Sequence, residues 1–281
     1  MSDRLAVLPQ YLIPKLALTR LMGWLAQRRG GTLTRATVTR FVARYGVDMT
    51  EAADPDIAHY ATFNEFFTRA LRPGTRPLAD APWLCPVDGA ISQFGSLDRD
   101  RLLQAKGHTY SACDLMGGDA AMAARFTGGS FATLYLSPRD YHRIHMPCEA
   151  GLRRMIHVPG ELFSVNPLTA RGVPGLFARN ERVVCEFQTD AGPFALVLVG
   201  ATIVGSMATV WHGVVNPPRA GRVRTWTYGD DEVRLERGAE MGRFLLGSTV
   251  VMLFPAGTIR FNPAWAPGRS IRMGEAMGVG P

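Results

Sequence analysis

Apolar side chains near the N-terminus follow a helical spacing. Residues 11–29 are predicted to form a helix that ends at Gly30-Gly31, because four apolar residues recur at the spacing of one helical face: Leu18, Leu21, Met22 and Leu25. A second helical face follows at Val38, Phe41, Val42 and Tyr45. A short helix is also expected within residues 60–75.

From about residue 85 the pattern changes to short apolar runs between turn signals, which is typical of strands. Residues 182–188 and 194–200 are predicted to form a hairpin around residues 189–192. Further strands are expected at residues 131–136, 201–211, 223–228 and 248–254. Strands and helices do not alternate as a Rossmann or TIM fold requires. The predicted class is therefore α+β, with short N-terminal amphipathic helices followed by a mostly antiparallel, β-sandwich-like core.

Composition and charge divide the chain into two expected parts. The 281 residues are 47% hydrophobic and 20% charged, enough apolar material for a sizeable core. Residues 1–50 hold eight Lys or Arg against two Asp, so most of the net charge of +7 lies there. We expect residues 1–50 to be basic membrane-associating helices and residues 51–281 to be a catalytic domain.

A basic, amphipathic segment with Trp24 and Tyr11 suits an in-plane contact with an anionic membrane. Packing of the same helices on the domain's own core, or a solvated basic face, would account for the pattern as well. Nucleic acid is disfavoured, because aromatic residues are not interleaved with the basic ones. No apolar run reaches the roughly 18 to 20 residues that span a bilayer, and no cleavable signal is evident. The four cysteines are spaced as free thiols.

Three short segments hold side chains that could carry chemistry. Asp88-Gly89 lies between apolar residues and by itself predicts a turn. His142 and His145 follow a predicted strand, where they could be a structural pair, a base, or part of a metal site that lacks a spaced third ligand. Gly247-Ser248 lacks the frame of a nucleophile elbow. An acid, imidazoles and a serine would form a proton relay if folding brought them together.

Beyond single motifs, the chain resembles the bacterial phosphatidylserine decarboxylases from about residue 10 to 256. Leu246-Gly247-Ser248-Thr249 is similar to the family's self-cleavage motif. Other segments resemble the family in the same order: residues 86–89, 106–108, 136–147, 163–166, 177–182, 199–206 and 240–244.

The resemblance implies that the protein makes its own cofactor. Ser248 would attack the carbonyl of Gly247 in an N-to-O acyl shift, and β-elimination would leave dehydroalanine that becomes an N-terminal pyruvoyl group. Asp88 would orient His145, and His145 would take the serine proton. The products would be a β chain of residues 1–247 and an α chain of residues 248–281.

The resemblance also implies the reaction that follows. The pyruvoyl carbonyl would form a Schiff base with phosphatidylserine, carbon dioxide would leave, and His142 would deliver a proton to give phosphatidylethanolamine. Lys106, His108, Ser164 and Asn166 are candidate substrate-binding residues, and no metal is expected.

The expected partners are phosphatidylserine, an anionic membrane surface, and the α and β chains of the protein itself as a heterodimer, which would pair into a homodimer. The expected location is peripheral, on the cytoplasmic side of the cell membrane. Two alternatives remain at this stage. One is a pyruvoyl-dependent decarboxylase of a soluble amino acid, and the other is a non-catalytic β-rich binding module.

Overall fold

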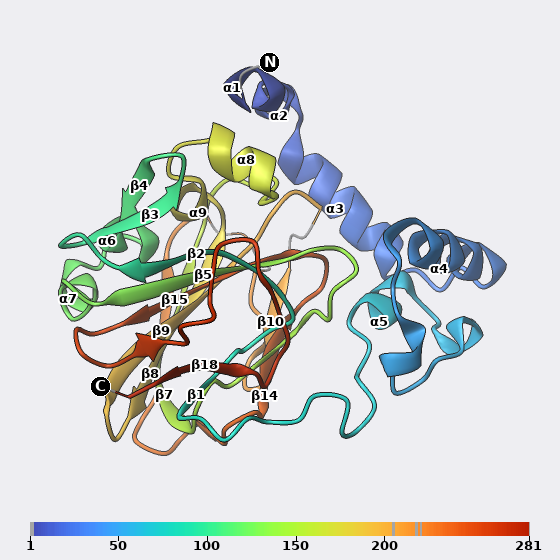
Figure 1. Cartoon of the computed structure of the whole chain (residues 1–281). Helices are drawn as coiled ribbons and strands as arrows, with labels where there is room; N and C mark the ends of the chain where they lie inside the picture. The colour runs from blue at the N-terminus through green and yellow to red at the C-terminus, as the bar shows by residue number, and fades with distance from the viewer. Residues whose placement is uncertain (1–2, 204–205, 217–218, 220, 281) are drawn as a thin grey trace.

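The structure is a computed structural model that describes residues 3–203, 206–216, 219 and 221–280. The side chains of Arg4 and Ser248 are outside this description. Four N-terminal helices run along the outside of a β-rich body (Figure 1). They are α1 (Asp3–Val7), α2 (Pro9–Leu12), α3 (Lys15–Ala26) and α4 (Thr32–Tyr45).

The helix predicted for residues 11–29 is divided in two. Ile13 is extended, with φ −70° and ψ 133°, because a residue before proline is driven away from the helical region, and α3 then begins at Lys15 after Pro14. The second helix is longer than its apolar face indicated and ends at Gly46, whose φ of 67° is left-handed. α4 packs on α5 (Phe63–Phe67), and both contribute to a small second core around Val38, Phe66 and Phe67.

Short helices connect the remaining elements. The 3₁₀ turns η1 (Met49–Glu51) and η2 (Ile57–His59) precede α5. The others are α6 (Ala112–Leu115), α7 (Ala120–Ala124), α8 (Pro167–Gly172) and α9 (Leu176–Arg179). Within residues 60–75 only α5 is helical, since Pro73 and Gly74 follow in a turn.

The largest sheet among the described residues has nine strands, and all its pairings are antiparallel. Its order is β12 (Arg224–Thr227), β7 (Ala150–Val158), β8 (Arg182–Thr189), β9 (Gly192–Val199), β15 (Ser248–Phe254), β5 (Ser130–Leu136), β2 (Gly89–Ser96) and β17 (Ser270–Ile271), with β13 (Arg234–Leu235) also on β7.

Smaller sheets complete the described body. One is β11 (Gly213–Val214), β10 (Met207–Thr209), β14 (Glu240–Phe244) and β6 (Arg143–His145). Another is β1 (Trp83–Leu84), β18 (Ala276–Val279) and β16 (Arg260–Phe261), and β3 (Arg101–Ala105) pairs with β4 (His108–Ser111). The α+β class and the antiparallel core are thereby confirmed.

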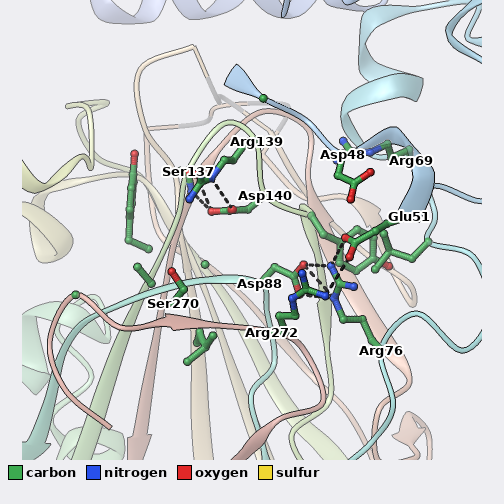
Figure 2. A pocket seen from close by; sticks show the side chains of 18 of the residues that line it. Asp48, Glu51, Arg69, Arg76, Asp88, Ser137, Arg139, Asp140, Ser270 and Arg272 are labelled. Carbon is green, nitrogen blue, oxygen red and sulfur yellow. Dashed lines mark hydrogen bonds and ion pairs between the residues drawn. The ribbon is translucent and has the colours of Figure 1, made fainter. Parts of the chain in front are cut away.

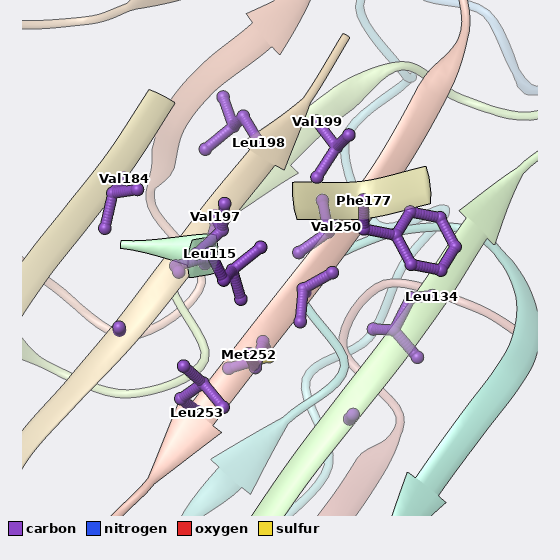
Figure 3. Packing of buried hydrophobic residues seen from close by; sticks show 14 of the residues in the cluster. Leu115, Leu134, Phe177, Val184, Val197, Leu198, Val199, Val250, Met252 and Leu253 are labelled. Carbon is purple, nitrogen blue, oxygen red and sulfur yellow. The ribbon is translucent and has the colours of Figure 1, made fainter. Parts of the chain in front are cut away.

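Strand β15 lies in the middle of the largest sheet, between β9 and β5. Val250, Val251, Met252, Leu253 and Phe254 are all fully buried, and Figure 3 shows several of them among side chains of the neighbouring strands. Its bounds agree with the predicted strand, and the predicted hairpin is present as β8 and β9. The strand predicted for residues 201–211 is wrong in extent, because only Met207–Thr209 is a strand there; residues 204–205 lie outside the described part.

Candidate active site

The peptide bond expected to be cut lies at the start of the central strand. Gly247 precedes β15, and the backbone of Ser248 pairs with Leu136 of β5. Leu246, one residue earlier, packs against both hydrophobic cores. The sheet and the α5 segment therefore hold the backbone of residues 246–248 from two sides.

His142 faces Gly247. Its imidazole is fully buried and packs on Phe67, with ring centroids 4.2 Å apart. A Cβ placed on Gly247 would lie 3.4 Å from His142 Nε2, so the lack of a side chain there leaves the imidazole direct access to the backbone. Because Nδ1 lies 2.7 Å from the carbonyl oxygen of Asp140, Nδ1 carries the proton and Nε2 presents a lone pair. Nε2 has no hydrogen-bond partner among the described residues.

Burial lowers the pKa of both histidines of this segment. Burial lowers the pKa of His142 to about 3, although the hydrogen bond to Asp140 opposes the shift. Burial also lowers the pKa of His145. His145 Nδ1 donates to the carbonyl of Gly238 at 2.7 Å, so its Nε2, 3.0 Å from the hydroxyl of Tyr141, accepts from that hydroxyl.

Asp88 is held by an arginine rather than by a histidine. Arg76 Nε lies 3.0 and 3.1 Å from the two carboxylate oxygens, Arg76 Nη2 lies 2.5 Å from Oδ2, and the backbone N–H of Met273 donates to Oδ1 at 2.8 Å. The hydrogen bond expected between Asp88 and His145 is not among those formed by the described residues. A guanidinium group can donate two hydrogen bonds to one carboxylate, which explains why Asp88 pairs with Arg76 rather than with His145.

Arg76 also connects Asp88 to the segment after α4. Its Nη2 lies 2.7 Å from Glu51, and Glu51 in turn pairs with Arg272 at 3.0 Å. Burial alone lowers the pKa of Arg76, but its hydrogen bonds to Asp88 and Glu51 more than offset this and raise the pKa overall. The same contact with Arg76 lowers the pKa of Glu51. No spacing in the sequence indicated Arg76 or Glu51.

A cavity of about 530 Å³ opens beside Asp88 (Figure 2). Side chains from the segment after α4, from the end of β5 and from β17 line it, including Arg69, Tyr135, Ser137, Tyr141 and Ser270. This size is within the roughly 300–1,000 Å³ that is usual for small-molecule sites.

The four candidate substrate-binding residues do not line this cavity. Lys106 pairs with Asp3 of α1, and Asn166 caps α8 by accepting from the backbone N–H of Thr169. The backbone N–H of Ser164 donates to Gln10, and His108 lies in β4. Pro167, which follows Asn166, does reach the cavity.

Within the part of the chain that the structure describes, no group of three or more His, Cys, Asp or Glu is placed to hold a metal ion. The described helices also include none long and apolar enough to cross a membrane.

The N-terminal helices carry a second feature, an exposed apolar surface. On α3, Thr19 and Ala26 face the protein, and Thr19 accepts a hydrogen bond from the backbone of Ile203. Large apolar side chains point away from the body, and we call this set the N-terminal apolar surface: Leu12, Leu16, Leu21, Trp24, Leu25 and Leu33. Leu12 is 88% exposed and Leu33 is 72% exposed. Basic side chains lie exposed on α3 and α4 and in the connection between them: Arg20, Arg28, Arg29, Arg35, Arg40 and Arg44.

Comparison with known proteins decides the family. A family model described as phosphatidylserine decarboxylase matches residues 63–279, and a second model, described as PSD, matches residues 5–46. The chain belongs to the phosphatidylserine decarboxylase family. The sequence resemblance noted above is thereby confirmed.

Family members with curated names align with nearly the whole chain. A protein of Methylibium petroleiphilum is 70% identical over 281 residues, which is all of this chain and 99% of that protein. One from Acidovorax ebreus is 72% identical over 277 residues, covering 99% of this chain and 98% of that protein. Both are named phosphatidylserine decarboxylase proenzyme. As a member of this family, the chain places its Gly-Ser motif at the start of a central strand and beside a buried imidazole.

Proposed function

We propose that this protein is a self-processing enzyme that decarboxylates phosphatidylserine to phosphatidylethanolamine. The observation that carries the proposal is the position of His142 Nε2, which faces Gly247 and lies 3.4 Å from where a Cβ on Gly247 would be, in a chain about 70% identical to proteins named as proenzymes of this reaction. A buried imidazole with an unused lone pair beside a Gly-Ser bond supports proton transfer at that bond.

The proposed first step cuts the chain between residues 247 and 248. The Ser248 oxygen bonds to the Gly247 carbonyl carbon as the amide C–N bond breaks. Elimination then removes the Cα proton of residue 248, breaks the Cβ–O bond and releases the carboxylate of residue 247. Water would hydrolyse the imine form of the dehydroalanine that remains, with release of ammonia, to leave a pyruvoyl group. In the assignment by family resemblance, His145 takes the serine proton and Asp88 supports it. For Asp88 to bind His145, one of the two must leave its present partner, because Asp88 is bound to Arg76 and His145 is bound to the carbonyl of Gly238.

The position of His142 favours a second assignment of the base, in which His142 itself takes the proton of Ser248. Its Nε2 is unprotonated and faces the scissile segment, whereas both nitrogens of His145 are in use. In the decarboxylation step, the same lone pair can accept a proton from the substrate ammonium and return it to the carbon that loses carbon dioxide.

A pyruvoyl group at position 248 would supply an electrophilic carbonyl and an electron sink for the decarboxylation. The surroundings fit such a group, because the buried Nε2 of His142 has no hydrogen-bond partner among the described residues and Phe67 covers the imidazole. Low polarity around His142 and Phe67 favours loss of a charged carboxylate as neutral carbon dioxide.

The two chains would stay together after the cut. Residues 248–254 remain paired with β9 and β5, and five consecutive buried side chains anchor them. At about 1.5–3 kcal/mol per buried large apolar side chain, this strand alone resists dissociation strongly. We infer an α–β heterodimer, and pairing of two such heterodimers is part of the proposal.

The N-terminal apolar surface supports attachment to a membrane from one side, with residues 1–50 as the attaching segment and residues 51–281 as the catalytic domain. An exposed apolar surface of this kind is typical of a site that binds a membrane or another protein. The accompanying arginines would be attracted to anionic headgroups, with a free energy of about 1 kcal/mol each. The proposed location is peripheral, on the cytoplasmic side of the cell membrane.

Intact mass under denaturing conditions tests the proposal. Wild type should give two chains, 1–247 and 248–281, with the second lighter than its serine form by one ammonia, and Ser248→Ala should stay whole. The cut enzyme should then release carbon dioxide from phosphatidylserine vesicles but not from free serine. A folded wild type that remains one chain would refute the self-processing, and release from free serine alone would refute the lipid substrate.

A further inference from the structure

Arg69 is a buried cation without a counter-charge. The residue is 6% exposed, and its guanidinium forms no ion pair with any of the described residues. Its Nε is shielded from solvent and has no hydrogen-bond partner there. The guanidinium carbon lies 5.3 Å from the ring centroid of Phe66, and burial lowers the pKa of Arg69.

The acidic residues nearest to Arg69 already pair with other residues. Asp88 is held by Arg76 and by the backbone of Met273, and Glu51 is shared by Arg76 and Arg272. Asp88 and Glu51 act on Arg69 only through the longer-range field that raises its pKa against burial. An unpaired buried charge lowers the stability of the fold, and a fold keeps one where a ligand supplies the missing charge.

The other acidic residues of the cavity accept hydrogen bonds from residues close to them in the chain. Asp140 accepts from the backbone N–H and the hydroxyl of Ser137, and Asp48 accepts from Thr50. Arg69 is therefore the cation of this cavity that a ligand could neutralise without displacing an ion pair.

Arg69 lies where such a ligand would reach the reaction centre. It lines the 530 Å³ cavity, and in Figure 2 it lies beside Asp48, with Ser137 and Arg139 across from it. Tyr135 lines the same cavity from β5 and pairs with Thr249 of β15. Besides burial, the charge of Arg69 contributes to the lowered pKa of His142.

We propose that Arg69 binds the phosphate of the phosphatidylserine headgroup in this cavity, an inference that rests on the function proposed above. Arginine is suited to phosphate because its planar donors engage two oxygens at once. The substrate carboxylate is the less suitable ligand, because a cation paired with it would stabilise the charge that must disappear when carbon dioxide leaves. The phosphate keeps its charge throughout the reaction.

The test uses Ser248→Ala, which stays uncut and cannot turn over substrate, so binding is measured apart from activity. Glycerophosphoethanolamine carries the phosphodiester without the carboxylate, and L-serine carries the carboxylate without the phosphate. Binding of each is followed by titration calorimetry and by the rise in unfolding temperature. Arg69→Met is compared with Arg72→Met, which removes the same charge three residues away at an exposed position outside the cavity.

We expect Arg69→Met to weaken glycerophosphoethanolamine binding about tenfold or more and Arg72→Met to leave it unchanged. We also expect the ligand-free Arg69→Met protein to unfold at the same or a higher temperature than its parent, because an uncompensated buried charge is removed. Lower stability without ligand would indicate a structural arginine and would contradict the proposal.

Equal binding by both variants, or an Arg69-dependent site for L-serine but not for glycerophosphoethanolamine, would also overturn it. Binding of inorganic phosphate alone would indicate a general anion site and would likewise refute the assignment to the headgroup. The wild-type assay on phosphatidylserine vesicles tests the proposed function separately. A working enzyme whose Arg69→Met variant keeps its KM would refute only this inference.

Discussion

Replacing Arg76 by methionine should destabilise the protein strongly. The side chains of Arg76 and Asp88 are 5% and 10% exposed, so the substitution leaves a buried carboxylate without its bidentate partner. Breaking such a pair from one side costs about 3–5 kcal/mol. In the variant, Asp88 still accepts a hydrogen bond from the backbone of Met273, and Glu51 still pairs with Arg272. We therefore expect a loss of unfolding free energy at the lower end of this range, about 3 kcal/mol. For a domain of this size that corresponds to a fall in melting temperature of about 6–12 °C.

The assay is thermal and urea unfolding in the Ser248→Ala background, where a single chain keeps unfolding simple. Arg272→Met is the matched control, because Arg272 also pairs with Glu51 but is 60% exposed, and exposed pairs contribute about 0–1 kcal/mol. Asp88→Asn alone and combined with Arg76→Met completes a double-mutant cycle. The double variant should be more stable than the sum of the single losses indicates, since no buried carboxylate is left unpaired.

Additive losses in that cycle, or an Arg76→Met loss no larger than that of Arg272→Met, would refute the reasoning. In the otherwise wild-type chain, Arg76→Met should also slow self-cleavage, because Asp88 loses the side chain that fixes the position of its carboxylate. Arg76→Lys should restore part of the cleavage rate, as it keeps the charge but not the fork.

Three further predictions concern the histidines and the membrane. If His145 is the base, as the family resemblance implies, His142→Ala should cut itself but release carbon dioxide slowly, whereas His145→Ala should stay uncut on a denaturing gel. An uncut but folded His142→Ala would instead show that His142 is the base, the assignment that its position beside Gly247 favours. The pKa of His142 is about 3 in the folded chain and near 6.5 when unfolded, so the unfolded chain binds more protons between these values. Stability should therefore fall as the pH drops from about 6.5 towards 3, by up to about 1.4 kcal/mol per pH unit, and His142→Asn should flatten this slope in a cleavage-blocked chain. Binding to anionic vesicles should weaken with added salt and with Trp24→Ser, whereas Val210→Ser, a similarly exposed position outside the helices, should bind as wild type does; equal losses would argue against the N-terminal apolar surface.

Local pattern was enough to predict the elements on which the site is built. A run of β-branched and apolar residues after Gly247 predicted the strand Ser248–Phe254 with its correct bounds, and turn residues predicted the hairpin of β8 and β9. These signals are local, because side-chain periodicity and turn chemistry act within a few residues. The order of motifs along the chain likewise indicated the family that the comparisons confirm.

Which face of α3 packs on the protein could be decided only from the tertiary structure. Spacing identified Leu21 and Leu25 as one face, but not whether the protein or the surroundings cover it. The fold buries Thr19 and Ala26 instead and leaves both leucines about half exposed. Amphipathicity fixes which residues share a face, whereas the choice of the face that docks depends on surfaces far away in the chain.

The sequence by itself determined the central strand, the hairpin, the family and the identities of Asp88, His142, His145 and Ser248 as the residues to consider. Only the tertiary structure decided which partners the described side chains take: Arg76 for Asp88, Tyr141 and Gly238 for His145, and Gly247 beside His142. Buried polar groups take whichever partner satisfies them with the best geometry. That partner comes from segments brought together by folding, and no local spacing encodes it.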